Sequence, residues 1–352
     1  MKEYKKLEFG KTKDGEKVDL IVLENDLGDK LELIPYGARI VALKFNENGT
    51  ERNIVLERNS VKDYENGGGS LGATVGPIAN RIKNAEFRFQ SNLYVIEKNE
   101  GNNVVHSGDL ALDYRLWDID EVSDHEVVFS IRVNEDNYPG DLRIKVRYSF
   151  SNDRKLYIDY EATSSEDTYV NLTNHSYFNI SDAETIKGLF FELNADFYTP
   201  IDDELIPTGE IAKVEGTQLD FRKLKSLKDY VEHGKEMFPA TKGIDHNFVL
   251  NKEERNELSY AARLVDKETG KQLVCFTDCP GIQVYTANLL DDYECDSGRK
   301  LGEFAGICLE TQFFPDFVNR AHFPAPLLKA GDEYKSSTVY VYTDWKEDFE
   351  EE

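Results

Sequence analysis

The segment Thr173-Asn174-His175-Ser176-Tyr177-Phe178-Asn179 is the part of the chain best equipped for chemistry. It follows residues 168–172, whose types favour a strand. Because alternate residues of a strand share a face, Asn171, Thr173 and His175 fall on one side. That side has amide, hydroxyl and imidazole groups but no lysine or glutamate, which suits a neutral ligand rich in hydroxyls. A lone histidine near a strand end is more often structural than catalytic, so a catalytic role for His175 depends on evidence from other segments.

A second candidate is Glu310, in the segment 306–312, which has the pattern of a strand. Its alternation partners are Cys308 and Gln312, and its apolar neighbours face the other way. A glutamate among uncharged residues is expected to be partly buried, and a buried carboxylate must be paired or functional. The alternative to a functional role is a structural ion pair with an arginine.

Three further segments place polar side chains inside apolar frames: Asn80 and Arg81 stand together, His106 ends an apolar run before a turn, and Asp245 follows a glycine turn. The six histidines show no metal-ligand spacing such as H-x-H or H-E-x-x-H, and no G-x-S-x-G elbow supplies a nucleophile. The segment 67–72 predicts a flexible loop and not a phosphate loop, because no Lys-Ser/Thr follows it. The residues therefore predict neither a metal nor a nucleotide cofactor.

The formal net charge of −25 argues against nucleic acid and anionic membranes as partners, because both bind basic surfaces. It also disfavours an anionic substrate. Nineteen tyrosines and twenty phenylalanines favour strands and supply the stacking surfaces of sugar sites. The N-terminal residues predict no signal peptide, and no apolar run approaches the ~18 residues that span a bilayer, so a cytoplasmic protein is expected. The C-x3-C pair Cys275 and Cys279 lacks zinc spacing, so the four cysteines are expected to be reduced thiols.

Strand signals dominate the elements that must position these residues. Alternating apolar residues at 142–148 and 156–162, joined by a turn at 151–154, predict an antiparallel hairpin. Other strands are expected at 127–133, 271–276, 281–288 and 337–343. Helices are few: one turn at 61–64 and a helix at 226–233, with Ser226 as its N-cap and Gly234 as its stop.

Many short strands without a βαβ rhythm predict an all-β sandwich or barrel. The charged segment 291–301 is expected to be an irregular loop. No Pro/Gly/Ser linker divides the chain, so residues 1–352 are expected to form one large domain.

Taken in order along the chain, the polar segments resemble those of the galactose mutarotase (aldose 1-epimerase) family. They are Asn80-Arg81-Ile82, His106-Ser107-Gly108, Asn174-His175-Ser176-Tyr177-Phe178-Asn179, Gly243-Ile244-Asp245-His246-Asn247, Gln283-Val284-Tyr285-Thr286-Ala287-Asn288, and Glu310-Thr311-Gln312 followed by Pro315-Asp316-Phe317-Val318-Asn319. Two positions depart from the family pattern, which more often has Arg where Pro77 stands and a second Gly where Ser107 stands. Because both flank the candidate site, they bear on sugar preference more than on reaction type.

The resemblance implies a large antiparallel β-sandwich, or supersandwich, with an open sugar-binding groove. It implies interconversion of the α and β anomers of aldohexoses such as galactose and glucose, with no cofactor and no metal. In that reaction Glu310 is the base on the anomeric hydroxyl and His175 the acid on the ring oxygen, and their roles reverse on ring closure. His106 is implied as a second donor that stabilises charge around the ring oxygen.

The resemblance also implies which residues hold the sugar. Arg81, Asp245 and Gln283 match the family's contacts to sugar hydroxyls, whereas Asn80 and Tyr177 are expected to support the site. The only partner implied is a small aldohexose, and the sequence leaves a monomer or a weak dimer open.

Three other functions stay open at this level. Two carboxylates, with Asp245 as the second, would suit glycoside hydrolysis. A catalytically silent sugar-binding module is disfavoured, because His175 and Glu310 are both present. A hexose-6-phosphate 1-epimerase would need a basic pocket, and the chain has few clustered Lys or Arg residues.

Overall fold

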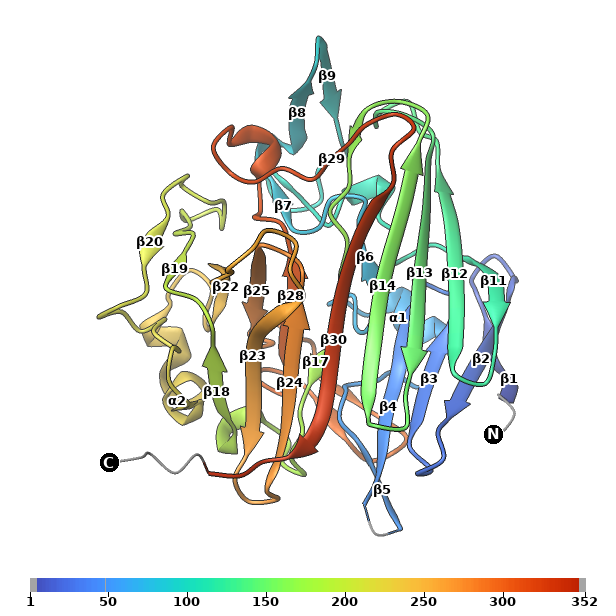
Figure 1. The fold of residues 1–352 in the computed structure, drawn as a ribbon, viewed down its shortest axis with the longest axis vertical. Coiled ribbons are helices and arrows are strands. Elements are labelled where there is room, and N and C mark those ends of the chain that lie inside the picture. The colour runs from blue at the N-terminus through green and yellow to red at the C-terminus, as the bar shows by residue number, and fades with distance from the viewer. Residues whose placement is uncertain (1–4, 48, 348–352) are drawn as a thin grey trace.

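Antiparallel sheets dominate the structure, a computed structural model that describes residues 5–47 and 49–347 (Figure 1). One layer is a nine-stranded sheet. The other layer consists of a six-stranded and a five-stranded sheet that lie side by side, joined by a bridge between Val55 and Phe178. The expected all-β sandwich is confirmed.

The nine-stranded sheet contains the predicted hairpin. Its two strands pair antiparallel from Leu142 opposite Ser164 to Phe150 opposite Leu156. Alternate residues of the first strand, such as Ile144 and Val146, are buried in the core, as the period of two in the sequence requires. In sheet order the strands are β11 (Asp118–Val122), β12 (Glu126–Val133), β13 (Leu142–Phe150), β14 (Lys155–Ser164), β30 (Tyr334–Asp344), β24 (Lys271–Thr277), β23 (Ser259–Asp266), β18 (Phe190–Leu193) and β21 (Lys225–Ser226).

The second layer packs on this sheet through aromatic side chains. Phe45 stacks on Tyr342 with ring centroids 4.2 Å apart, and the Tyr340 hydroxyl donates a hydrogen bond of 2.8 Å to the carbonyl of Leu309. The six-stranded sheet has the order β17 (Tyr177–Phe178), β28 (Ile307–Gln312), β25 (Gly281–Tyr285), β22 (Asp245–Val249), β19 (Phe197–Tyr198) and β20 (Ala212–Lys213). The five-stranded sheet has the order β1 (Lys5–Lys11), β2 (Lys17–Glu24), β3 (Lys30–Ile34), β4 (Arg39–Glu47) and β5 (Thr50–Asn53).

The remaining elements are short. The two-stranded pairs are β7 (Arg81–Ile82) with β10 (Val104–Val105), β16 (Thr173–Asn174) with β6 (Thr74–Val75), β15 (Thr168–Tyr169) with β29 (Leu327–Leu328), β8 (Glu86–Phe89) with β9 (Asn92–Val95), and β26 (Tyr293–Glu294) with β27 (Lys300–Leu301). Of these strands, β7, β8, β9 and β29 lie at one end of the sandwich (Figure 1). The helices are α1 (Val61–Asn66) and α2 (Lys228–Met237), with 3-10 turns η1 (Lys83–Ala85), η2 (Gly108–Leu110), η3 (Ile186–Gly188) and η4 (Phe317–Asn319). In the described part of the chain, no helix is long and apolar enough to cross a bilayer.

The predicted helix at 226–233 is shifted in the structure. It begins at Lys228 and continues through Gly234 to Met237. Leu227 is the N-cap residue, and the Ser226 hydroxyl accepts a hydrogen bond from the Lys228 N–H. A Cβ on Gly234 would stand 3.2 Å from the ring of Phe304, so this glycine allows close packing and does not end the helix.

Other expectations need smaller corrections. The charged segment 291–301 is not wholly irregular, because its ends form the β26–β27 hairpin. The strand expected at 281–288 ends at Tyr285. The run before His175 is interrupted into the short strands β15 and β16, and both its faces are buried, so Asn171 lies in the interior and hydrogen bonds to the backbone of residue 313.

The second half of the glycine-rich segment 67–72 is buried, whereas Gly68 and Gly69 are exposed. Leu71 is buried, its carbonyl accepts a hydrogen bond from the Arg39 guanidinium, and the Gly72 N–H donates to the carbonyl of His175. Arg39 is 1% exposed and also donates to the carbonyls of Tyr36 and Asp113. A single buried side chain therefore joins three loops, in keeping with the need of a buried cation for hydrogen-bond acceptors.

Gly72→Ala is expected to destabilise the fold strongly. Its φ is +69°, and a Cβ would stand 2.0 Å from the carbonyl oxygen of Ile40. Left-handed backbone costs a residue with a Cβ about 1–2 kcal/mol, and the clash adds about 1–3 kcal/mol. Gly216→Ala is the matched control, because its φ is +76° and nothing lies within 4 Å of its Cβ position. Equal urea midpoints for the two variants would contradict this reading.

Candidate active site

A cavity of about 330 Å³ is lined by residues of the short strands β7 and β10 and of the six-stranded sheet. Seven of the eight residues predicted from the sequence line it: Asn80, Arg81, His106, His175, Tyr177, Asp245 and Glu310. The eighth, Gln283, does not. Segments far apart in the chain thus bring their polar side chains to one place of a size typical for a small ligand.

Glu310 reaches the cavity from the middle of β28. This strand pairs with β25 on one side, where Gln283 stands opposite Glu310, and with β17 on the other, where Tyr177 stands opposite Cys308. The Glu310 side chain is 2% exposed, and its Oε2 atom has no hydrogen-bond partner in the described residues. Among the described residues, the ion-pair partner of Glu310 is His175 and not an arginine, so the arginine ion pair considered from the sequence is not present there.

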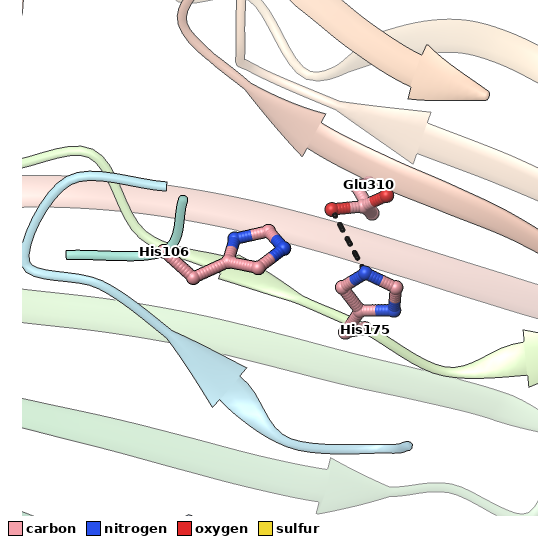
Figure 2. A group of neighbouring side chains, drawn as sticks. All are labelled: His106, His175 and Glu310. Carbon is pink, nitrogen blue, oxygen red and sulfur yellow. Dashed lines mark ion pairs between the residues drawn. The ribbon is translucent and has the colours of Figure 1, made fainter. Parts of the chain in front are cut away.

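His175 lies between β16 and β17 and faces Glu310 (Figure 2). Its backbone is fixed on both sides, since its N–H donates to the carbonyl of Ala73 and its carbonyl accepts from Gly72. The imidazole stacks on Tyr177 at a centroid distance of 5.1 Å. Its Nε2 atom lies 3.6 Å from Glu310 Oε2, and its Nδ1 atom lies 3.5 Å from the sulfur of Cys308.

Burial opposes charge on both members of this pair. Loss of hydration lowers the pKa of His175 to about 4 and raises the pKa of Glu310 well above its ordinary value, with nearby Asp245 raising it further. Both shifts favour a pair that is neutral overall and holds one mobile proton at neutral pH. A carboxyl and an imidazole that share one proton beside a cavity can act as acid and base in a single reaction.

His106 is fixed by a reciprocal pair of hydrogen bonds to Asn80. The His106 N–H donates to the Asn80 carbonyl at 3.0 Å, and the Asn80 N–H donates to His106 Nδ1 at 3.2 Å. Because Nδ1 is an acceptor, the neutral ring carries its hydrogen on Nε2. Burial and the neighbouring His175 lower the pKa of His106 well below its ordinary value, so the ring stays neutral. Both Asn80 and His106 have left-handed backbone, with φ of +66° and +53°.

The same hydrogen bond bears on metal binding. The potential ligand atoms of His106, His175 and Glu310 lie within 4.8 Å of one another, a spacing from which a metal ion could be held. To bind a metal through Nε2, His106 would have to lose the hydrogen on that atom or move it to Nδ1. On Nδ1 the hydrogen would point at the Asn80 backbone N–H, which donates to the same atom, so two hydrogens would clash. The donor set therefore fits a metal poorly.

Arg81 lies opposite Asp245, which Gln283 contacts in turn. Its Nη1 atom is 3.5 Å from Asp245 Oδ2, and Gln283 donates a hydrogen bond of 2.5 Å to Asp245 Oδ1. Gln283 thus lies behind Asp245 and orients it. Burial alone would lower the pKa of Arg81, but Asp245 and Glu100 outweigh that effect and raise it, so the guanidinium is charged.

Sequence reasoning missed three residues at this site. Glu100 forms an ion pair with Arg81, Cys308 contacts His175, and Asp113 lines the cavity with its Oδ1 buried and unpartnered in the described residues. Cys308 had a usable signal, because it alternates with Glu310 in one strand. Glu100 and Asp113 lie in loops, where no periodicity shows which way a side chain points.

The departure at Ser107 has a visible structural role. Ser107 is buried with a φ of +68°, a conformation that glycine adopts at lower cost. Its hydroxyl donates to the carbonyl of Ile78 and accepts from the Ile78 N–H, both at 2.9 Å. Ile78 is next to Pro77, so the two departures from the family pattern lie close together, and the Ser107 hydroxyl joins its own loop to the loop that contains Pro77.

Comparisons with known proteins agree with this arrangement. The profile of the aldose 1-epimerase family matches residues 19–341. The chain is 36% identical to the galactose mutarotase of Sus scrofa over 321 residues, 89% of this chain and 91% of that one. It is 34% identical to the aldose 1-epimerase of Haemophilus influenzae over 341 residues, 95% and 96% of the two chains. Its structure matches that of a GalM/aldose epimerase homologue from C. elegans with a TM-score of 0.86 at 32% identity, covering 93% and 99%.

The fold and these relatives define an isomerase of the mutarotase type. The chain belongs to the aldose 1-epimerase family.

Glu310→Gln is expected to stabilise the fold near pH 8, because the glutamine need not be protonated on folding, whereas the buried Glu310 carboxyl must regain a proton that the unfolded chain has released. The raised pKa gives the sign of the pH dependence. Above pH 4.5 the unfolded chain releases this proton while the folded protein retains it, so wild-type stability falls as pH rises. Urea unfolding at several pH values should show an advantage for the variant that grows with pH. A wild type more stable than the variant at pH 8 would contradict the assigned direction.

Proposed function

We propose that the protein interconverts the α and β anomers of aldohexoses such as galactose and glucose. The main support is the Glu310–His175 pair, which is buried, faces a cavity of sugar size and holds one mobile proton. The names of the relatives, galactose mutarotase and aldose 1-epimerase, support the same reaction and the same class of substrate.

In the proposed mechanism the reactive form has the mobile proton on His175 and a carboxylate on Glu310. Glu310 accepts the proton of the anomeric hydroxyl while His175 Nε2 gives its proton to the ring oxygen. The bond between C1 and the ring oxygen breaks, and the anomeric oxygen becomes the carbonyl oxygen of the open-chain aldehyde. After rotation about C1–C2, His175 takes its proton back from the C5 hydroxyl, which attacks C1, and Glu310 returns its proton to the former carbonyl oxygen.

The neighbouring residues have positioning and binding roles in this proposal. The Nε2 hydrogen of His106 is a fixed donor for charge that develops near the ring oxygen. Arg81 and Asp245 hold sugar hydroxyls through charge-assisted hydrogen bonds, and Gln283 orients Asp245. Asn80 holds His106, and Tyr177 holds the ring of His175 by stacking.

Purified protein should accelerate the mutarotation of freshly dissolved α-D-galactose over the uncatalysed rate in a polarimeter. The reaction needs proton transfers alone, so EDTA is expected to leave the rate unchanged. Loss of activity in EDTA that a divalent ion restores would contradict the cofactor-free mechanism. Sugar binding without any acceleration would identify a silent binding module instead.

Glu310→Gln and His175→Asn should each lower kcat by at least about 10²-fold, since a positioned acid or base contributes about 10²- to 10⁴-fold. The double variant should lose little more, because the two residues act in one proton relay. His106→Asn should cost less than His175→Asn, and His233→Asn, an exposed position in α2, is the control. A near-native kcat in Glu310→Gln would overturn the mechanism.

Wild-type activity should fall when the pH is lowered to about 4. The Glu310–His175 pair then takes up a second proton on His175, so neither residue can act as a base.

A further inference from the structure

The Arg81 guanidinium is clamped from outside the cavity by Glu100. Arg81 Nε donates to Glu100 Oε2 at 2.6 Å, and Arg81 Nη2 donates to Glu100 Oε1 at 2.9 Å. This bidentate contact is the strongest geometry that an arginine and a carboxylate can adopt. The third nitrogen, Nη1, points to Asp245 at 3.5 Å. Each nitrogen of the guanidinium therefore faces a carboxylate, and its charge is compensated from two sides.

In the part of the chain that the structure describes, the rest of the cavity lining contains no free positive charge. Among the described residues that line it, Arg81 is the one arginine or lysine, whereas Asp113, Asp245 and Glu310 all carry carboxyl groups. His106 and His175 are neutral near pH 7 because burial lowers the pKa of both rings. Arginine and lysine are the side chains that bind phosphate groups by charge, and the described residues that line this cavity include no unpaired one.

The position of Glu100 suits a role in the choice between neutral and anionic ligands. It lies in the turn between β9 and β10, where its carbonyl accepts a hydrogen bond from the Asn103 N–H. Its side chain is 37% exposed, whereas that of Arg81 is 11% exposed, so Glu100 lies on the solvent side of the ion pair. An anion approaching Arg81 would have to displace this carboxylate or remain beside it, and either event is unfavourable. A neutral hydroxyl needs only the guanidinium hydrogens that Glu100 leaves free.

We propose that Glu100 is a specificity-determining residue that makes the site select neutral aldoses over sugar phosphates. This inference rests on the proposed aldose 1-epimerase activity and identifies the residue that sets its substrate class. Glu100 has two effects: it holds the Arg81 side chain in place for sugar hydroxyls, and it cancels the charge that would otherwise attract a phosphate.

The test compares wild type, Glu100→Gln and Glu97→Gln for kcat/KM with D-galactose and with D-galactose 6-phosphate. Glu97 is an exposed residue of the same loop, so its variant removes one charge from the same surface without touching Arg81. Wild type and Glu97→Gln should prefer galactose to the same extent. Glu100→Gln should lower that preference at least about tenfold, because it removes the negative charge that neutralises Arg81 in a partly buried site. Inorganic phosphate should inhibit galactose turnover more strongly in Glu100→Gln than in the other two proteins.

Each remaining outcome has one reading. If Glu100→Gln lowers both kcat/KM values equally, Glu100 only positions Arg81 and the specificity role is wrong. If all three proteins share one preference, or if wild type prefers the phosphate, the proposal is also overturned. A wild type without mutarotase activity would refute the proposed function instead. Calorimetric binding of the two sugars to the same three proteins then tests Glu100 without turnover, and Glu100→Ala replaces the glutamine variant if that one fails to fold.

Discussion

The antiparallel register of β28 is the constraint on which the site depends. β28 lies between β17 and β25, and this register puts Cys308 beside Tyr177 and Glu310 beside Gln283. A slip of one residue would turn Glu310 into the apolar core and bring Leu309 to the cavity. The register is held by the core on the other face of the strand, where Ile307 and Leu309 are fully buried. The geometry of the candidate site and the packing of the core are therefore fixed by the same hydrogen-bonded ladder.

Removal of water is the second principle of the site. Glu310 and His175 are 2% and 5% exposed, and burial disfavours the charged form of each. In water an isolated carboxylic acid and an imidazole would differ in pKa by about 2 units, with the proton on the imidazole. Burial lowers the pKa of His175 and raises that of Glu310, so that the carboxyl has the higher pKa of the two. The preference of the shared proton for the imidazole is thereby removed, which suits a reaction in which the proton must move both ways.

Much of the fold could be predicted from the sequence because it depends on period-two patterns. The hairpin of β13 and β14 and the strands β12, β24 and β30 lie where their alternation places them. Predictions failed where a local signal had another cause. Gly234 has the sequence signature of a helix stop, yet it serves close packing against Phe304. The segment 67–72 has the composition of a free loop, yet Arg39 holds it through the carbonyl of Leu71.

The candidate site could likewise be predicted in part: the residue types could, and their contacts could not. The types and order of His175, Glu310, Arg81 and Asp245 were visible in the sequence, and the fold brings them to one cavity. Which of them touch each other was not visible. That Glu100 pairs with Arg81 depends on how a turn folds back over β7, and that Gln283 lies behind Asp245 depends on the offset between β22 and β25. Contacts between distant segments are set by tertiary packing, about which a single sequence says little.

The buried Arg39 has a consequence for how the protein opens. Its three carbonyl contacts link β4 and the turn before it to Leu71 and to Asp113, which lines the cavity. If the five-stranded sheet unfolded locally, the Arg39 guanidinium would either lose its carbonyl partners in an apolar interior or move into solvent. Either event would free the wall of the cavity. Strand β4 and the wall of the cavity therefore belong to one cooperative unit. Amide hydrogens in β3 and β4 should exchange with solvent at rates linked to those around residues 70–73, and a sugar in the cavity would slow both together.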